Sequence, residues 1–167
     1  MRIPVFVSCP TALNTKQDRS RQMILSELKR MQLDPRALGR SDYPTELPLR
    51  EVYVIAKHCS GGVILGFEQS YAAKIIHKRG VRGKTKPDKE VILPTPWNHL
   101  EAGILFGMNL PLLVFKEAGI FGGVFDIGVT DNFVHPMPTP KLNAEQRRAL
   151  TEVFLKWQFR VRDHYYK

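Results

Sequence analysis

Short apolar segments alternate with amphipathic helical segments along this chain, and this order is its most restrictive feature. The segments at residues 3–9 (IPVFVSC), 63–67 (VILGF) and 112–115 (LLVF) are rich in β-branched and aromatic residues and show no polar alternation. Such runs are typical of strands that are buried on both faces. Strands of this kind, separated by helices, predict an α/β fold in which helices cover both faces of a mostly parallel sheet.

Four helices are predicted from their end signals and apolar stripes. The first helix has Asp18 as its cap, and the second has Pro48 in its first turn. The third has Thr95 as its cap and Pro96 at its first position, and the fourth begins at Asn143, whose capping box is completed by Gln146. Less regular segments predict a short strand near Leu38, a strand or a helix at residues 71–76, and a loop with one short strand at residues 119–128. We expect one α/β domain over residues 1–135, followed by a proline-rich spacer and a helix that packs on the domain over residues 136–167.

The net charge of +9, from 25 Lys and Arg against 16 Asp and Glu, is concentrated in two segments. Residues 77–90 hold six basic and two acidic residues, and residues 141–167 hold seven basic and three acidic ones. Each segment therefore has a surplus of four positive charges, and the rest of the chain is nearly neutral. Because residues 77–90 show no apolar periodicity, we expect them to form an exposed, mobile basic loop.

Composition excludes several classes of protein. A hydrophobic share of 43% excludes a wholly disordered chain, and the apolar runs are too short for a membrane span or a secretory signal. The five histidines and the two cysteines, Cys9 and Cys59, lack metal-ligand spacing, so we expect no metal. The two cysteines should lie at opposite edges of a parallel sheet, which argues against a disulfide between them. We expect an intracellular, cytoplasmic protein with no membrane partner.

A ligand site is expected where the parallel strands end, at their carboxyl edge. The residues at those ends are Ser8, Cys9, Pro10 and Thr11 at the end of the first strand, Phe67 at the end of the strand at 63–67, and Glu117 just beyond the strand at 112–115. The helix that begins at Thr95 should place its amino end, with the positive end of its dipole, at the same edge.

Glu101 is the informative residue of that helix. At roughly 100° per residue, it lies near the middle of an arc made by Trp97, Leu100, Ile104, Leu105 and Met108. A carboxylate in such a position either faces the mouth of a pocket or is a structural group paired with a cation. Trp97 is likewise either a core residue or a surface on which a ligand ring stacks.

Residues 95–115 (TPWNHLEAGILFGMNLPLLVF) resemble the signature of the superfamily that joins TIR domains and nucleoside 2-deoxyribosyltransferases, in which a W-x-x-x-E segment opens a helix. Residues 5–11 (VFVSCPT), 61–67 (GGVILGF) and 116–128 (KEAGIFGGVFDIG) resemble its first strand and loop, its third strand and its closing loop. The resemblance implies a flavodoxin-like three-layer sandwich. The basic segment and the last helix lie outside it.

The resemblance also implies cleavage or transfer at an N-glycosidic bond of a nucleotide, with NAD as the expected substrate and no bound cofactor. Glu101 would be the key carboxylate, because a fixed carboxylate stabilises the oxocarbenium-like state of ribosyl transfer. The expected substrate-binding residues are Ser8, Cys9, Pro10, Thr11, Phe67, Trp97, Asn98, Glu117 and Asp126. Asp126 is the candidate for the aspartate that the transferases place near the ribose. The charged residues typical of TIR domains in the loop after the first strand are absent.

Three other hypotheses stay open. The chain is a nucleotide sensor or scaffold without turnover, or a nucleoside 2-deoxyribosyltransferase, or it binds nucleic acid through its basic segments. The resemblance further implies a homo-oligomer or an assembly with a partner protein, and a role in antiviral signalling.

Overall fold

Five parallel strands form the central sheet in the order β2-β1-β3-β8-β9. They are β1 (Ile3–Ser8), β2 (Leu33–Arg36), β3 (Gly62–Gly66), β8 (Leu112–Lys116) and β9 (Val134–Pro136). This computed structural model describes residues 2–37, 47–88 and 90–167. Counted along the sheet strands alone, the order is that of flavodoxin-like, doubly wound folds, and the predicted α/β fold class is confirmed.

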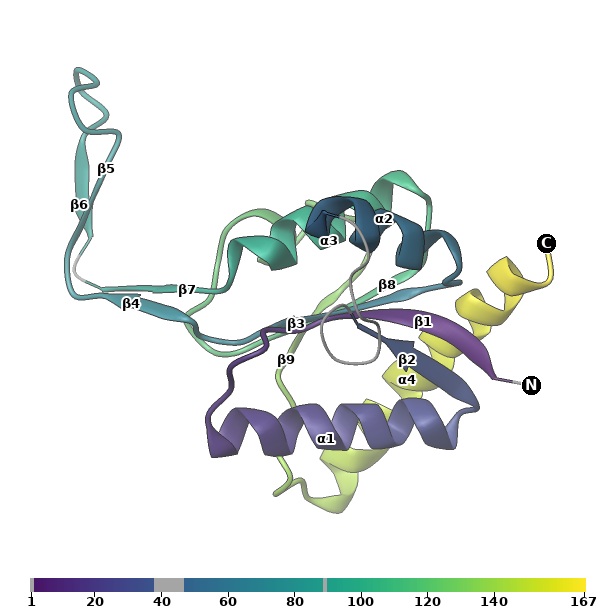
Figure 1. Ribbon diagram of the computed structural model, residues 1–167. Coiled ribbons are helices and arrows are strands. Elements are labelled where there is room, and N and C mark those ends of the chain that lie inside the picture. The colour runs from purple at the N-terminus through teal and green to yellow at the C-terminus, as the bar shows by residue number, and fades with distance from the viewer. Residues whose placement is uncertain (1, 38–46, 89) are drawn as a thin grey trace.

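Four helices cover the two faces of the sheet (Figure 1). They are α1 (Thr15–Arg30), α2 (Pro48–Lys57), α3 (Pro96–Gly107) and α4 (Ala144–Tyr165). Helices α1 and α4 lie on one face, and α2 and α3 lie on the other. The result is a three-layer sandwich in which the C-terminal helix is part of one layer.

Two apolar cores separate the sheet from its helices. Val5, Val7 and Phe154 belong to the core on the side of α1 and α4, whereas Phe6 and Leu105 belong to the core on the side of α2 and α3. Because side chains alternate along a strand, the odd-numbered residues of β1 face one core and the even-numbered residues face the other. This alternation decides which residues at the end of β1 lie near α3.

One local prediction near the amino end is corrected. The cap of α1 is Asn14 rather than Asp18, since the Asn14 side chain accepts from the amide of Gln17 while the Gln17 side chain accepts from the amide of Asn14. The second strand begins at Leu33, and its proline is tolerated because β2 is an edge strand. The strand predicted near Leu38 lies outside the described residues.

The segment predicted as a loop, residues 77–90, is exposed over residues 78–87 as expected, but residue 77 and residues 86–88 belong to strands. The chain forms β5 (Ile75–His77) and β6 (Lys86–Asp88), which pair as an antiparallel ribbon. A second ribbon, made of β4 (Ser70–Ala72) and β7 (Val91–Leu93), connects the first to the sandwich. The β5–β6 ribbon projects away from the body (Figure 1). It shows no apolar periodicity because neither of its faces covers a core.

The segment after β8 contains the 3-10 helix η1 (Gly123–Phe125) in place of the predicted short strand. Phe125 is fully buried in the core on the side of α3. Among the described residues, no helix combines the length and the apolar character that crossing a membrane requires.

Candidate functional site

Ser8 is the last residue of β1 and lies at the carboxyl edge of the sheet, opposite Ile64 of β3. The strands on the two sides of β1 are β2 and β3, so the sheet order reverses here. Doubly wound folds bind their ligands at this switch point. Ser8 is an even-numbered residue of β1, and it faces α3.

Helix α3 begins at the same edge. The Thr95 side chain accepts a hydrogen bond from the amide of Trp97, and Pro96 occupies the first turn, as predicted. The buried face of α3 consists of Asn98, Ala102 and Leu105. Glu101 lies at the border of this face, roughly 60° around the helix from Asn98, and not at its centre as predicted.

The predicted apolar arc is corrected for a physical reason. Trp97 is 40% exposed and Leu100 is 48% exposed. Asn98 takes the position facing the sheet because Ser8 gives its amide a hydrogen-bond partner in an otherwise apolar region. Burying Asn98 turns Trp97 and Leu100 toward solvent.

A chain of polar contacts joins Asn98, Ser8 and Glu101. The Nδ2 of Asn98 donates to the Oγ of Ser8 over 2.7 Å, and both residues are fully buried. The hydroxyl of Ser8 also interacts with the carboxyl group of Glu101 and favours its ionised form. Asn98, Ser8 and Glu101 therefore form one polar cluster.

Burial raises the pKa of Glu101 to about 7, and the hydrogen bond from Ser8 opposes part of that rise. In the described part of the chain, no lysine or arginine forms an ion pair with this carboxylate. A partly buried carboxyl group that is not neutralised by a cation costs stability. Groups of this kind concentrate at functional sites.

A second polar atom of the cluster lacks a partner. The Oδ1 of Asn98 is buried and accepts no hydrogen bond from any described residue. Leaving a buried acceptor without a donor costs about 1–3 kcal/mol. Such an atom is normally satisfied by a water molecule or a ligand hydroxyl. The cluster therefore has unused hydrogen-bonding capacity directly beside Glu101.

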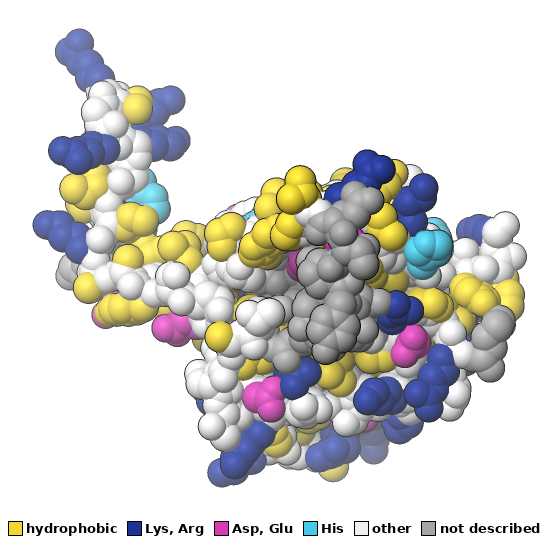
Figure 2. Space-filling model, viewed as in Figure 1, with side chains coloured by type: hydrophobic (Ala, Val, Ile, Leu, Met, Phe, Trp, Pro, Cys, Tyr) yellow, Lys and Arg dark blue, Asp and Glu magenta, His cyan; other side chains and the backbone are white. Residues whose placement is uncertain are grey.

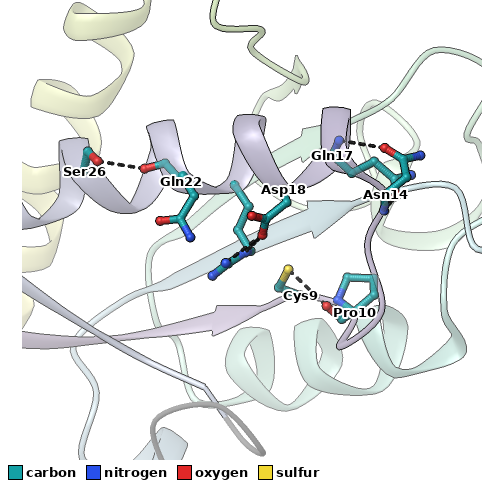
Figure 3. A network of polar contacts seen from close by, with 8 residues as sticks. Cys9, Pro10, Asn14, Gln17, Asp18, Gln22 and Ser26 are labelled. Atoms are coloured by element: carbon teal, nitrogen blue, oxygen red, sulfur yellow. Dashed lines mark hydrogen bonds and ion pairs between the residues drawn. The ribbon is translucent and has the colours of Figure 1, made fainter.

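The remaining residues of the first loop are divided between the two faces. Cys9 is odd-numbered and contacts the core on the side of α1, where its thiol donates to the carbonyl of Pro10 over 3.5 Å (Figure 3). Pro10 is buried and Thr11 is exposed. Phe67 is fully buried in the core beneath α1. The structure therefore brings Ser8, and not Cys9 or Phe67, to Glu101.

Glu117 is also on the far face. Its Oε2 accepts from the amide of Glu68 over 2.7 Å and from the Nε2 of Gln17 over 3.0 Å. The same Nε2 reaches the carbonyl of Glu68. These contacts join the start of α1 to the ends of β3 and β8. Glu117 is therefore a structural link here, and not a neighbour of Glu101.

These residues border an open cleft of about 770 Å³ on the α1 side of the carboxyl edge. Its lining includes Gln17, Glu117 and His135, and burial lowers the pKa of His135. Gln17 was not among the predicted site residues. The pattern Asn14-x-x-Gln17 was the available signal, because it matches the capping box predicted for the last helix (Figure 3).

Asp126 is exposed and belongs to the loop that follows η1. Its Oδ1 accepts from the amide of Gly122 over 2.8 Å and so closes its own turn. The adjoining Phe125 contacts His99 of α3 edge-on, with ring centroids 5.4 Å apart. Asp126 is thus close to α3 along the chain, but it makes no described contact with Glu101.

The described residues contain no group of three or more His, Cys, Asp or Glu side chains that could hold a metal ion. Cys9 and Cys59 are not joined by a disulfide, as predicted. No protein-family model, curated protein or solved structure matches this chain.

Proposed function

We propose that this protein cleaves or transfers at the N-glycosidic bond of a nucleotide, with NAD as the substrate and Glu101 as the acting carboxylate. The observation that carries the proposal is the Asn98–Ser8–Glu101 cluster at the switch point of the sheet. A partly buried carboxylate beside a hydroxyl and an unused buried acceptor is a suitable environment for a ribose that develops positive charge.

This reaction needs few catalytic groups besides Glu101. Cleavage of the bond between nicotinamide and ribose starts from a cationic ring, so the leaving base needs no strong general acid. The ionised Glu101 stabilises the oxocarbenium-like state or binds the ribose hydroxyls, and water or a second acceptor completes the reaction. Because burial raises the pKa of Glu101 to about 7, this carboxyl group changes its ionisation near neutral pH.

Two further features of α3 support a nucleotide. The amino end of the helix offers backbone amides and the positive end of a dipole, both of which favour phosphate oxygens. Trp97 is in the first turn and is 40% exposed, which leaves part of its ring free for stacking.

The test compares the unmodified protein with Glu101→Gln by measuring nicotinamide release from NAD. The substitution keeps the size of the side chain and removes its charge, so we expect a loss of about 100-fold or more. Glu152→Gln is the matched control, because Glu152 is exposed on α4, far along the chain from the cluster. It should keep full activity. Equal rates for Glu101→Gln and the unmodified protein would contradict the proposal.

A second candidate function is a nucleotide sensor without turnover. It is favoured by Asp126, the second predicted carboxylate, which is exposed and bound to its own loop. NAD that raises the melting temperature and is recovered intact would support the sensor. Exchange of bases between deoxynucleosides would instead identify a nucleoside 2-deoxyribosyltransferase.

A further inference from the structure

The β5–β6 ribbon and the turn that joins its strands, residues 74–88, form a basic arm. The arm contains six lysines and arginines and one acidic residue, Asp88, at the end of β6. All six cationic residues are exposed, and they are Lys74, Lys78, Arg79, Arg82, Lys84 and Lys86. Figure 2 shows their side chains pointing outward in several directions from the projecting ribbon.

None of the six side chains takes part in an ion pair or a hydrogen bond with the residues whose side chains the structure describes, a set that does not include Asp88. The arm stands clear of the sandwich, and the acidic side chains visible in Figure 2 lie near its base and on the sandwich. Like charges at this density repel one another, so a bound polyanion would stabilise the arm.

The tip of the arm is organised by turns. Amides of Val81 and Lys84 donate to the carbonyls of Lys78 and Val81 over 3.0 and 3.1 Å. The hydroxyl of Thr85 donates to the carbonyl of Lys78 over 2.9 Å. Lys78 itself has a positive φ of 50°. The cations are therefore presented on a shaped, hydrogen-bonded ribbon.

We propose that the basic arm binds double-stranded DNA, with the β5–β6 ribbon in the major groove and its lysines and arginines on the flanking phosphates. The major groove of B-form DNA is about 12 Å wide and admits a two-stranded ribbon. The cations on both sides of such a ribbon then face both phosphate backbones. This function is independent of the chemistry proposed for Glu101.

The edges of the ribbon argue against a protein strand as the occupant. Pro87 lies in the middle of β6 and has no amide proton for an added strand. Lysines next to the strand also oppose edge pairing. Duplex RNA is disfavoured because its major groove is deep and narrow.

The experiment measures binding to a fluorescently labelled 25-base-pair DNA duplex by anisotropy, at 50 and 200 mM salt. The arm variant carries Arg79→Ala, Arg82→Ala, Lys84→Ala and Lys86→Ala. The control variant removes four exposed charges from α4 instead, with Arg147→Ala, Arg148→Ala, Lys156→Ala and Arg162→Ala. Both variants have the same net charge. We expect the arm variant to lose at least about tenfold in affinity and to show a shallower salt dependence, and the control to lose less than about threefold.

Three further measurements make the result decisive. Arg79→Lys with Arg82→Lys keeps the charge and should keep the affinity. Glu101→Gln should bind DNA as the unmodified protein does, whatever its activity on NAD. Circular dichroism should show that all variants are folded. The proposal is overturned if the unmodified protein fails to bind the duplex at 50 mM salt or if the arm and control variants lose equally. Tighter binding to single-stranded DNA, duplex RNA or phosphatidylserine vesicles would also overturn it.

Discussion

Glu101 is held in a position that favours its neutral form. Burial raises its pKa to about 7, whereas the hydrogen bond from Ser8 favours the ionised form but compensates only in part. In the unfolded chain the same carboxyl group has an ordinary pKa. The folded protein therefore keeps a proton on Glu101 over a pH range in which the unfolded chain has released it.

This difference predicts how stability depends on pH. As pH rises from about 4.5 to about 7, the unfolded state binds fewer protons at this site than the folded state does, so the free energy of unfolding falls. Glutamine at position 101 does not titrate, so the Glu101→Gln variant does not lose free energy of unfolding in this way. Relative to the unmodified protein, its free energy of unfolding should increase between pH 4 and pH 8 by up to about 3 kcal/mol. Urea unfolding at a series of pH values measures the difference.

The control for this pH dependence is a glutamate on the surface. Glu152→Gln on the exposed surface of α4 should change stability by the same small amount at every pH. A difference between Glu101→Gln and the unmodified protein that does not vary with pH would show that the pKa of Glu101 is not raised in the folded state.

Ser8 offers a second prediction at this scale. Ser8→Ala removes the donor that stabilises the ionised carboxylate, so the pKa of Glu101 should rise further. The midpoint of the rise in NAD cleavage with pH should shift to higher pH, measured as kcat/KM of the free enzyme. A purely structural role for Ser8 would lower the rate at every pH and leave the midpoint in place.

At the scale of the element, the strand β3 depends on a close approach to η1. A Cβ built on Gly66 would lie 2.4 Å from the Cε1 of Phe125, whose ring is fully buried. That ring also contacts His99 in the second turn of α3. Gly66 therefore allows η1 to pack onto the sheet next to the helix that carries Glu101.

We expect Gly66→Ala to destabilise the protein by about 1–3 kcal/mol, because a rigid buried ring cannot make room for a methyl group. Gly103→Ala is the matched control. Gly103 is exposed on α3, and a Cβ there would meet no atom within 4 Å. Alanine should stabilise the helix by about 0.5–1 kcal/mol. Thermal unfolding of both variants tests the pair, and a harmless Gly66→Ala would contradict the close packing.

At the scale of the whole molecule, α4 completes the sandwich. Phe154, Trp157 and Val161 are buried against the sheet. The Nε1 of Trp157 donates to the carbonyl of Pro111 over 2.9 Å, and a Cβ on Gly61 would lie 2.6 Å from Val161. The last helix is therefore part of the fold and holds the amino ends of β3 and β8.

Trp157→Ala should cost about 3–5 kcal/mol of unfolding free energy, because it leaves a cavity in the core beneath α4. Phe159→Ala on the same helix is the control, since Phe159 is 74% exposed, and it should change stability by no more than about 0.5 kcal/mol. Urea midpoints measure both. Equal effects of the two substitutions would mean that α4 does not dock through Trp157.

The amino-acid sequence was sufficient to predict the α/β class, the parallel sheet, the four α-helices and the central strands β1, β3 and β8. These elements can be predicted from local patterns. A strand buried on both faces is continuously apolar, and capping residues such as Asn143 and Thr95 mark where a helix begins. Glu101 was identifiable for the same reason, as a carboxylate among apolar residues of one helix.

The sequence could not show which of the predicted site residues lie together, because this depends on long-range contacts. Ser8 and Asn98 are hydrogen-bonded although they are 90 positions apart in the sequence. Because Asn98 faces the sheet, Trp97 faces outward and Glu101 lies at the border of the buried face. Because side chains alternate along β1, Cys9 lies on the side of α1, opposite Glu101. Long-range hydrogen bonds from Gln17 and Glu68 make Glu117 a structural link. The ribbon structure of the basic arm could not be predicted from the sequence. A ribbon with solvent on both faces has no apolar periodicity, so its shape appears only when its two strands are seen to pair.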